Sequence, residues 1–156
     1  MGKNGKVNVQ DLENFRKKIE NSLGNQQVIL FMESCAKELA ARLLAKVIKR
    51  TPVGQYPASS GKKGGTLRRG WTGEKSQSAS AYAQSLKVNH FGNVYVIEVI
   101  NPVEYAPYVE FGHRTRGGDG WVEGKFMLTI SEQEIERDAP KILENKLKKK
   151  LGECFK

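Results

Sequence analysis

The sequence predicts an α+β fold: a long N-terminal helix packed on a small antiparallel sheet, with a short helix, a C-terminal helix and long mobile loops. Three observations support this prediction. Apolar residues recur every three or four positions over residues 25–50, which is typical of one face of a helix. Apolar residues alternate along two short runs within 85–101, as they do in strands. Residues 51–81 are rich in Gly, Ser, Lys and Arg and offer few side chains for a core.

The chain of 156 residues has the length of one domain. We expect residues 1–24 to form an N-terminal extension with a short helix, and residues 25–156 to form a single domain. The long helix of that domain should end at Thr51, because a residue that precedes a proline, here Pro52, disfavours the helical conformation. Residues 51–81 are then expected to form a flexible basic loop.

Two strands and two helices complete the predicted domain. The segments 85–90 and 94–101 are expected to form a hairpin around a Phe-Gly-Asn turn, since Gly and Asn tolerate positive φ. Both faces of the second strand are largely apolar, which favours a central position in the sheet. A short helix is expected over 103–111 and a final helical region over 124–151. Pro140 either kinks that final helix or starts a second one.

The net charge of +9 is unevenly distributed along the chain. Residues 1–72 carry 14 Lys/Arg against 5 Asp/Glu (+9), residues 73–140 carry 6 against 10 (−4), and residues 141–156 carry 6 against 2 (+4). Such a chain suits binding to a polyanion, and equally binding between copies, the basic part of one meeting the acidic part of the next. No stretch approaches the roughly 18 apolar residues of a membrane span. We therefore expect no membrane contact, and synthesis and use in a cytoplasm.

A first candidate binding site is the cationic part of the predicted loop, over residues 61–69 with a tryptophan beside it. Lysine and arginine neutralise phosphates, and an aromatic ring stacks on a base, so this set could bind nucleic acid. The alternative is a solvated loop that keeps the protein soluble. The candidate residues are Lys62, Lys63, Arg68, Arg69 and Trp71.

A second candidate is the segment "EYAPYVEFG" at residues 104–112. Its aromatic side chains cannot all face inward on one short helix, so some aromatic surface should remain outside among the acids. Aromatic residues with a polar rim are typical of protein interfaces. The alternative is that all of them pack on the sheet of the same chain. The predicted contact residues are Tyr105, Tyr108, Glu110 and Phe111, with Arg114 and Arg116 in the polar loop that follows.

Catalytic and metal sites find little support. Glu110 and His113 would share a helix face, with Asp119 close in sequence, but no second histidine stands at ligand spacing. A histidine at the end of a helix is more often a capping residue. "SGKKGGT" lacks the spacing of a phosphate-binding loop, and the two cysteines, Cys35 and Cys154, have no partner at metal-ligand spacing. The sequence therefore predicts neither an enzyme nor a cofactor.

Three stretches resemble a family of tailed-phage and prophage proteins that complete the tail or join it to the head. "TPV" with "GTLRRGW" (51–53 and 65–71) is similar to the family's Thr-Pro-Val followed by Thr-Gly-x-Leu-Arg-x-Ser-Trp. "NPVEYAPYVEFGH" (101–113) resembles Asn-x-x-x-Tyr-Ala-x-Tyr-Val-Glu-Phe/Tyr-Gly. "GKFML" (124–128) is like the Gly/Pro-x-Phe-Met that opens the family's last helix. The resemblance covers nearly the whole chain beyond about residue 25.

The resemblance implies a structural virion protein of the neck or tail end, without enzyme activity or cofactor. It implies a ring, commonly of six copies, that contacts the head connector and the tail tube or its terminator, after assembly in the host cytoplasm. DNA in the lumen is a further contact that loop 61–69 could make. By position, Gly65, Leu67, Arg68 and Trp71 would fix the entrance to the sheet, and Tyr105, Ala106, Tyr108, Val109, Glu110, Phe111 and Gly112 would fix the central helix. Two alternative hypotheses for the function are a nucleic-acid-binding protein that uses loop 61–69, and an enzyme that uses His113, Glu110 and Asp119.

Overall fold

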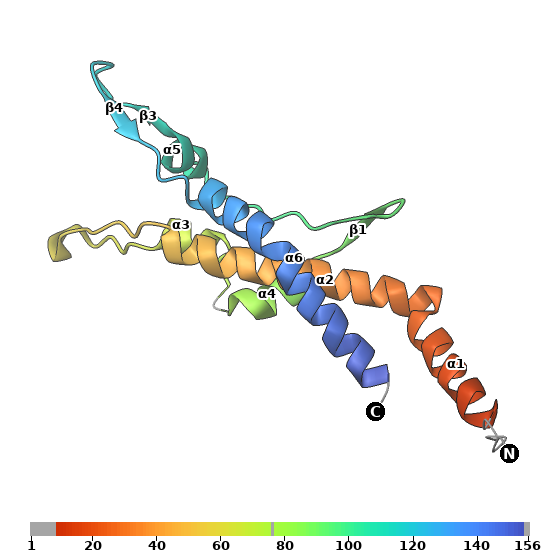
Figure 1. Ribbon diagram of the computed structural model, residues 1–156. Helices are drawn as coiled ribbons and strands as arrows, with labels where there is room; N and C mark the ends of the chain where they lie inside the picture. The colour runs from red at the N-terminus through yellow and green to blue at the C-terminus, as the bar shows by residue number, and fades with distance from the viewer. Residues whose placement is uncertain (1–8, 76, 155–156) are drawn as a thin grey trace, which may run out of the picture.

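The computed structural model describes residues 9–75 and 77–154, which fold around one long helix (Figure 1). Helix α1 (Val9–Leu23) leads through Gly24 into helix α2 (Asn25–Arg50), and the two helices differ in direction. The short helix predicted in the N-terminal extension is present, although residues 1–8 lie outside the described part. Whether the extension and residues 25–156 are separate units stays a prediction.

Helix α2 ends where the sequence predicts, at Thr51. The backbone N–H of this residue donates to the Val47 carbonyl oxygen at 2.9 Å, and its hydroxyl donates to the same oxygen at 2.6 Å. Thr51 itself has the extended backbone that a residue before proline prefers. The chain therefore leaves the helix in one fixed direction from a fully buried side chain.

The core lies along the C-terminal half of α2. Leu44 and Val47 are fully buried, and helices α4 (Ala79–Ser85) and α6 (Met127–Cys154) supply most of the packing against α2. In Figure 1, α6 crosses the middle of α2 while α4 lies alongside it. The buried cluster comprises Ala40, Leu44, Val47, Leu67, Trp71, Ala83, Ala106 and Met127.

The sequence predicts that residues 51–81 form one loop. This prediction is wrong, because part of the segment is helical and buried. A 3₁₀ turn, η1 (Ala58–Ser60), interrupts an exposed stretch, and helix α3 (Thr66–Gly70) follows it. Leu67 of α3 and the adjoining Trp71 belong to the core. Glycine at position 70 permits this packing, since a Cβ there would lie 2.2 Å from the Asn101 side chain.

The β structure consists of two separate two-stranded antiparallel ladders. Strand β1 (Asn89–Phe91) pairs with β2 (Val94–Val96), and β3 (Gly112–Arg114) pairs with β4 (Trp121–Glu123). The α+β class is confirmed, with a long helix, small antiparallel sheets, a short helix and a C-terminal helix. The central position predicted for the second strand is wrong, because β2 pairs only with β1 and the ladder stops at Val96.

Helix α6 is a single element with Pro140 inside it, so the predicted alternative of a second helix beginning there is wrong. Glu134 ties α6 to α2 by accepting from Lys46 Nζ at 2.8 Å and from the Arg50 guanidinium. These two donors, Lys46 first, lower the pKa of Glu134 to about 2. The α2–α6 crossing is thus held by charge as well as by apolar packing.

Candidate protein interface

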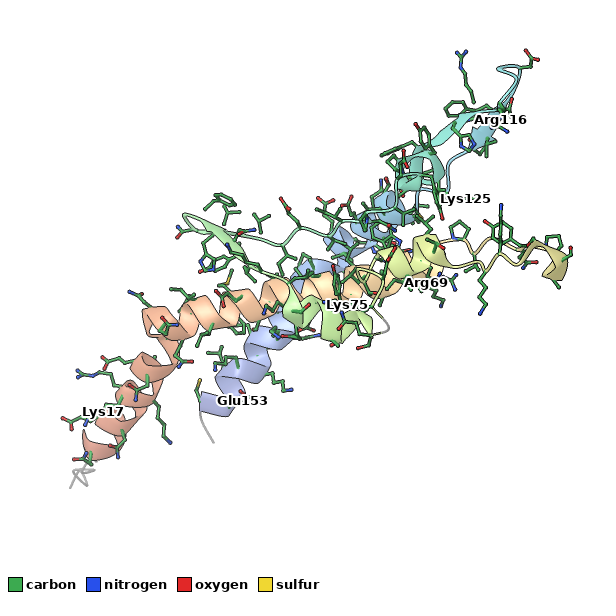
Figure 2. The ribbon with its side chains drawn as sticks, turned by 180° about the vertical axis from the view of Figure 1, so that it is seen from behind. Lys17, Arg69, Lys75, Arg116, Lys125 and Glu153 are labelled. Carbon is green, nitrogen blue, oxygen red and sulfur yellow. The ribbon has the colours of Figure 1, made fainter. Side chains whose placement is uncertain are left out.

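A group of exposed apolar side chains gathers at one end of the molecule, around α5 (Ala106–Phe111), the β3–β4 hairpin and the start of α6. We call this surface the aromatic end. Figure 2, which labels Arg116 and Lys125 there, shows it projecting beyond the crossing of the long helices. Its exposed members are Tyr105, Tyr108, Phe111, Trp121, Val122, Phe126 and Ile130.

The side chains of α5 and its N-cap residue are divided between an exposed face and a buried face, as the sequence predicts. Tyr105, Tyr108 and Phe111 recur every third position, and they are 46%, 58% and 61% exposed. Ala106 and Glu110 lie on the buried side. Because residues three or four apart share a face of a helix, a six-residue helix that buries these two must expose the aromatic positions. The prediction that some aromatic surface remains outside is confirmed.

Glu110 corrects the predicted interface set, because its carboxylate is buried and caps another helix. The side chain is 5% exposed. It accepts from the backbone N–H groups of Leu128 and Thr129, both at 2.9 Å, and from the Thr129 hydroxyl at 2.7 Å. The first N–H groups of a helix have no partner within the helix, so Glu110 of α5 satisfies two at the start of α6.

Backbone contacts hold the same two helices together. Lys125 N donates to the Val109 carbonyl oxygen at 2.8 Å, and Phe126 N donates to the Glu110 carbonyl oxygen at 3.0 Å. This approach requires glycine at position 124, where a Cβ would lie 2.4 Å from the Glu110 oxygen. Glycine at position 112 ends α5 with a φ of +86°. The aromatic end is therefore fixed to α6.

The polar loop after α5 is an ordered hairpin. Thr115 N donates to the Gly120 carbonyl oxygen and Gly120 N donates to the Thr115 hydroxyl, both at 3.0 Å. Trp121, which follows, is 55% exposed. Arg114 and Arg116 are exposed and have no ion pair among the described residues. The sequence gives a weak signal for Trp121 and Val122 as surface residues, because a three-residue strand is too short to show alternation.

The predicted basic site divides into structural and exposed residues. Arg68 donates to the Thr51 carbonyl oxygen from Nε at 3.2 Å and from Nη2 at 2.7 Å. Trp71 is 3% exposed and donates from Nε1 to the Thr51 hydroxyl at 2.8 Å. The prediction that Trp71 contacts a partner or stacks on a base is therefore wrong for this chain as folded. Both residues fix the end of α2 rather than the entrance to a sheet.

The remaining cations stay on the surface. Lys62 lies over the Tyr56 ring, 5.9 Å from its centroid, and Arg69 donates to the Gly64 carbonyl oxygen at 3.3 Å. Lys63 and Tyr105 line one pocket of about 250 Å³ between loop 52–67 and α5. The structure thus brings together one residue from each of the two candidate sites.

The residues considered for catalysis do not assemble into a site. The Glu110 carboxylate is engaged by α6, whereas His113 Nδ1 lies 3.4 Å from the Tyr108 carbonyl oxygen. A position at the end of α5 fits the capping role expected of His113. Within residues 9–75 and 77–154, no group of three or more His, Cys, Asp or Glu side chains could hold a metal ion. Among the same residues, no helix has both the length and the apolar character to cross a membrane.

These features define a small α+β protein whose most distinctive surface is an apolar end suited to contact with other proteins. The chain belongs to the family described as "Bacteriophage HK97-gp10, putative tail-component", whose sequence model matches residues 13–112. No curated protein and no solved structure matches the chain. Family membership confirms the resemblance and makes the chain a structural component of a phage tail, and thus of a virion. The match includes α2 and α5 but ends before β4 and α6.

Proposed function

We propose that the chain forms a ring, with six copies, that completes the tail and joins it to the head, and that it acts by binding rather than by catalysis. The observation that carries the proposal is the aromatic end. Phe111 and Trp121 are each more than half exposed on a segment that backbone hydrogen bonds hold in place. An ordered apolar surface with a polar rim is typical of protein–protein contact sites.

The aromatic end of one copy contacts a neighbouring protein of the neck in this arrangement. Full burial of one large apolar side chain contributes about 1.5–3 kcal/mol. Association costs about 4–15 kcal/mol in lost freedom of motion, so a single aromatic contact is insufficient. A ring repeats the same contact around its circumference, which is why a structural assembly suits this surface.

The exposed lysines extend the proposed contact. Lys62 and Lys63 lie on a loop whose base packs near α5. In the proposed ring these lysines meet exposed glutamates of the next copy. Glu104 and Glu123 are exposed in the described structure, whereas Glu110 is not. The head connector and the tail tube or its terminator are the proposed partners at the two faces of the ring. Contact between the lysines and DNA in the lumen remains a further part of the proposal.

The test uses particles assembled in a host that carries the phage genome with this gene replaced. Phe111→Ser with Trp121→Ser removes two of the exposed aromatic side chains of the aromatic end without changing a core residue. We expect electron microscopy to show separate full heads and finished tails with this variant. Phe91→Ser is the matched control, since Phe91 is 67% exposed on the distant β1–β2 turn. Normal yields of joined particles from the double variant would refute the proposal, provided that both proteins unfold at the wild-type temperature.

A further inference from the structure

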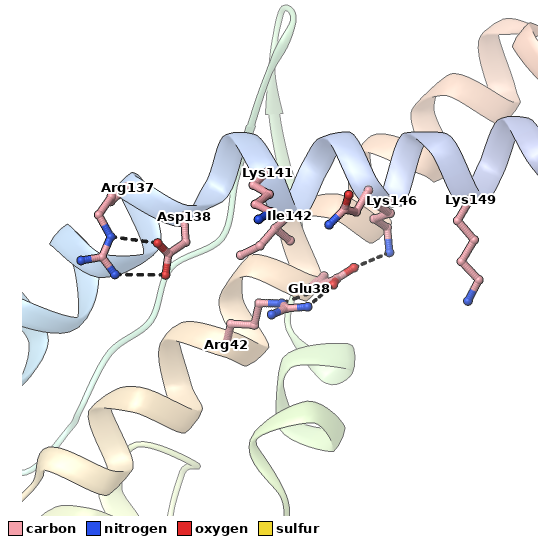
Figure 3. A pocket seen from close by; sticks show the side chains of 9 residues that line it. Glu38, Arg42, Arg137, Asp138, Lys141, Ile142, Lys146 and Lys149 are labelled. Atoms are coloured by element: carbon pink, nitrogen blue, oxygen red, sulfur yellow. Dashed lines mark hydrogen bonds and ion pairs between the residues drawn. The ribbon is translucent and has the colours of Figure 1, made fainter.

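A groove runs between α2 and the C-terminal half of α6, at the opposite end of α6 from the aromatic end. Figure 3 shows one part of it, where Arg42 of α2 faces Lys141 and Ile142 of α6. An adjoining part has Leu30 and Phe31 of α2 on one side. Lys146 and Lys149 line both parts, whose volumes are about 540 and 420 Å³.

The groove has an excess of cations that the chain itself does not neutralise. Glu38 accepts from Lys146 at 2.8 Å and from Arg42 at 3.0 Å, which lowers the pKa of that carboxyl, the hydrogen bond from Lys146 being the main cause. Asp138 pairs with the neighbouring Arg137. The ammonium groups of Lys141, Lys149 and Lys150 have no ion pair or hydrogen bond with any described residue. Figure 3 shows Lys149 extended with no partner.

The lining favours a peptide over a nucleic acid. Leu30 is 48% exposed beside Phe31, so an occupant that covers both must offer apolar groups as well as negative charge. An amphipathic helix with acidic residues has this composition. Residues 1–8 carry two lysines and no acid, and residues 155–156 add another lysine, so these terminal segments do not supply the charge.

The same helix carries the matching charge in its other half. Residues 127–138 have four acids against one arginine, a net of −3, and residues 139–154 have five lysines against two glutamates, a net of +3. Glu132 and Glu136 are exposed one turn apart and have no ion pair among the described side chains, whereas Glu134 pairs with α2 and Asp138 with Arg137. Ile135 is partly exposed and three residues after Glu132, so it shares a helix face with that acid. Glu136 and Lys149 are 13 residues apart on one helix, about 20 Å at 1.5 Å per residue, so these two side chains cannot meet within one copy.

We infer that the groove between α2 and the basic half of α6 binds the acidic half of α6 from a second copy, in a head-to-tail contact. The contact joins two different surfaces, and such heterologous interfaces close into rings when the rotation between copies allows it. This inference rests on the proposed ring and names the surfaces that build it. The acidic surface and the α6 side of the groove lie beyond the residues that the family model matches, whereas the α2 side of the groove lies within them.

The test is a charge exchange in the full chain. Lys141→Glu with Lys149→Glu makes a groove variant, Glu132→Lys with Glu136→Lys makes an acid variant, and a third protein combines all four changes. We expect sedimentation to show association about tenfold weaker for the groove and acid variants, and largely restored for the combined protein. An equimolar mixture of the groove and acid variants should associate as well, because the original contact and the exchanged contact alternate when the two proteins alternate.

Lys148→Glu is the matched control. Lys148 precedes Lys149 in the sequence but does not line the groove, and its Nζ pairs with Glu144 at 2.6 Å. We therefore expect this substitution to leave association unchanged. Wild-type self-association that none of the charge changes weakens would overturn the inference and leave the proposed ring in place. The inference would also be overturned if the combined protein did not recover self-association and did not form joined particles. That result would indicate that the groove binds an acidic partner other than a second copy. A wild-type chain that never associates and is dispensable for joining would refute the proposed function itself.

Discussion

Replacement of Glu110 by alanine tests whether this residue is a structural cap or part of an interface. The change removes all three acceptor contacts at the start of α6 and leaves the N–H groups of Leu128 and Thr129 without a protein partner. An N-cap side chain contributes about 0.5–2 kcal/mol, and a hydrogen bond to a charged group contributes about 1.5–3 kcal/mol. We therefore expect the free energy of unfolding to fall by about 3 kcal/mol.

The effect is measured by denaturant and thermal unfolding followed by circular dichroism. For a chain of this length, about 3 kcal/mol corresponds to a fall of about 6–12 °C in melting temperature. Glu104→Ala is the matched control, because Glu104 is an exposed acid of the same segment and its loss should change stability by no more than about 0.5 kcal/mol. Glu110→Gln keeps one carbonyl acceptor and should lie between the two. A Glu110→Ala protein as stable as the control would refute the capping role.

Three further predictions concern the core and the α2–α6 crossing. Trp71→Phe keeps an aromatic ring but removes the hydrogen bond to Thr51, so urea unfolding should show a loss of about 1–3 kcal/mol; an unchanged midpoint would contradict the buried position. The folded pKa of Glu134, about 2, lies below its ordinary value of 4.5, so its stabilisation is complete above pH 4.5 and is lost as the pH falls towards 2. Glu134→Gln should flatten the stability profile in that window, and an identical profile would count against the ion pair. Gly124→Ala should lower the melting temperature, because its Cβ would lie 2.4 Å from a carbonyl oxygen of α5, whereas Gly152→Ala, in open space, should not.

Local signals predict the ends of the helices well. The proline after Thr51 excludes further helix, and the glycine at position 112 ends α5, because each acts on its own backbone. The three-residue spacing of Tyr105, Tyr108 and Phe111 likewise predicts exposure, since a short helix cannot bury every side. These conclusions need no knowledge of distant residues.

The predictions from the sequence are wrong where a residue far away in the chain determines the environment of a side chain or strand. Trp71 stands in a polar, glycine-rich stretch, and its burial depends on the Thr51 hydroxyl and on the α2 side chains around it. Glu110 stands among exposed aromatics, yet the N-terminus of α6, 17 residues later, draws its carboxylate inward. The strand predicted over 94–101 stops at Val96 because no second neighbour pairs with it, and pairing is not encoded in one strand alone.

The rigidity of α6 links the two surfaces proposed for assembly. At one end Glu110 fixes the helix to α5 and thus to the aromatic end, and about two turns further along Glu134 fixes it to α2. The groove lies beyond this second attachment, so its direction relative to the aromatic end is set by the folded chain rather than by a linker. A ring with a defined number of copies requires a constant rotation between neighbours, and a contact site that swings freely cannot supply it. Loss of either attachment should therefore impair ring closure even when every contact residue is intact.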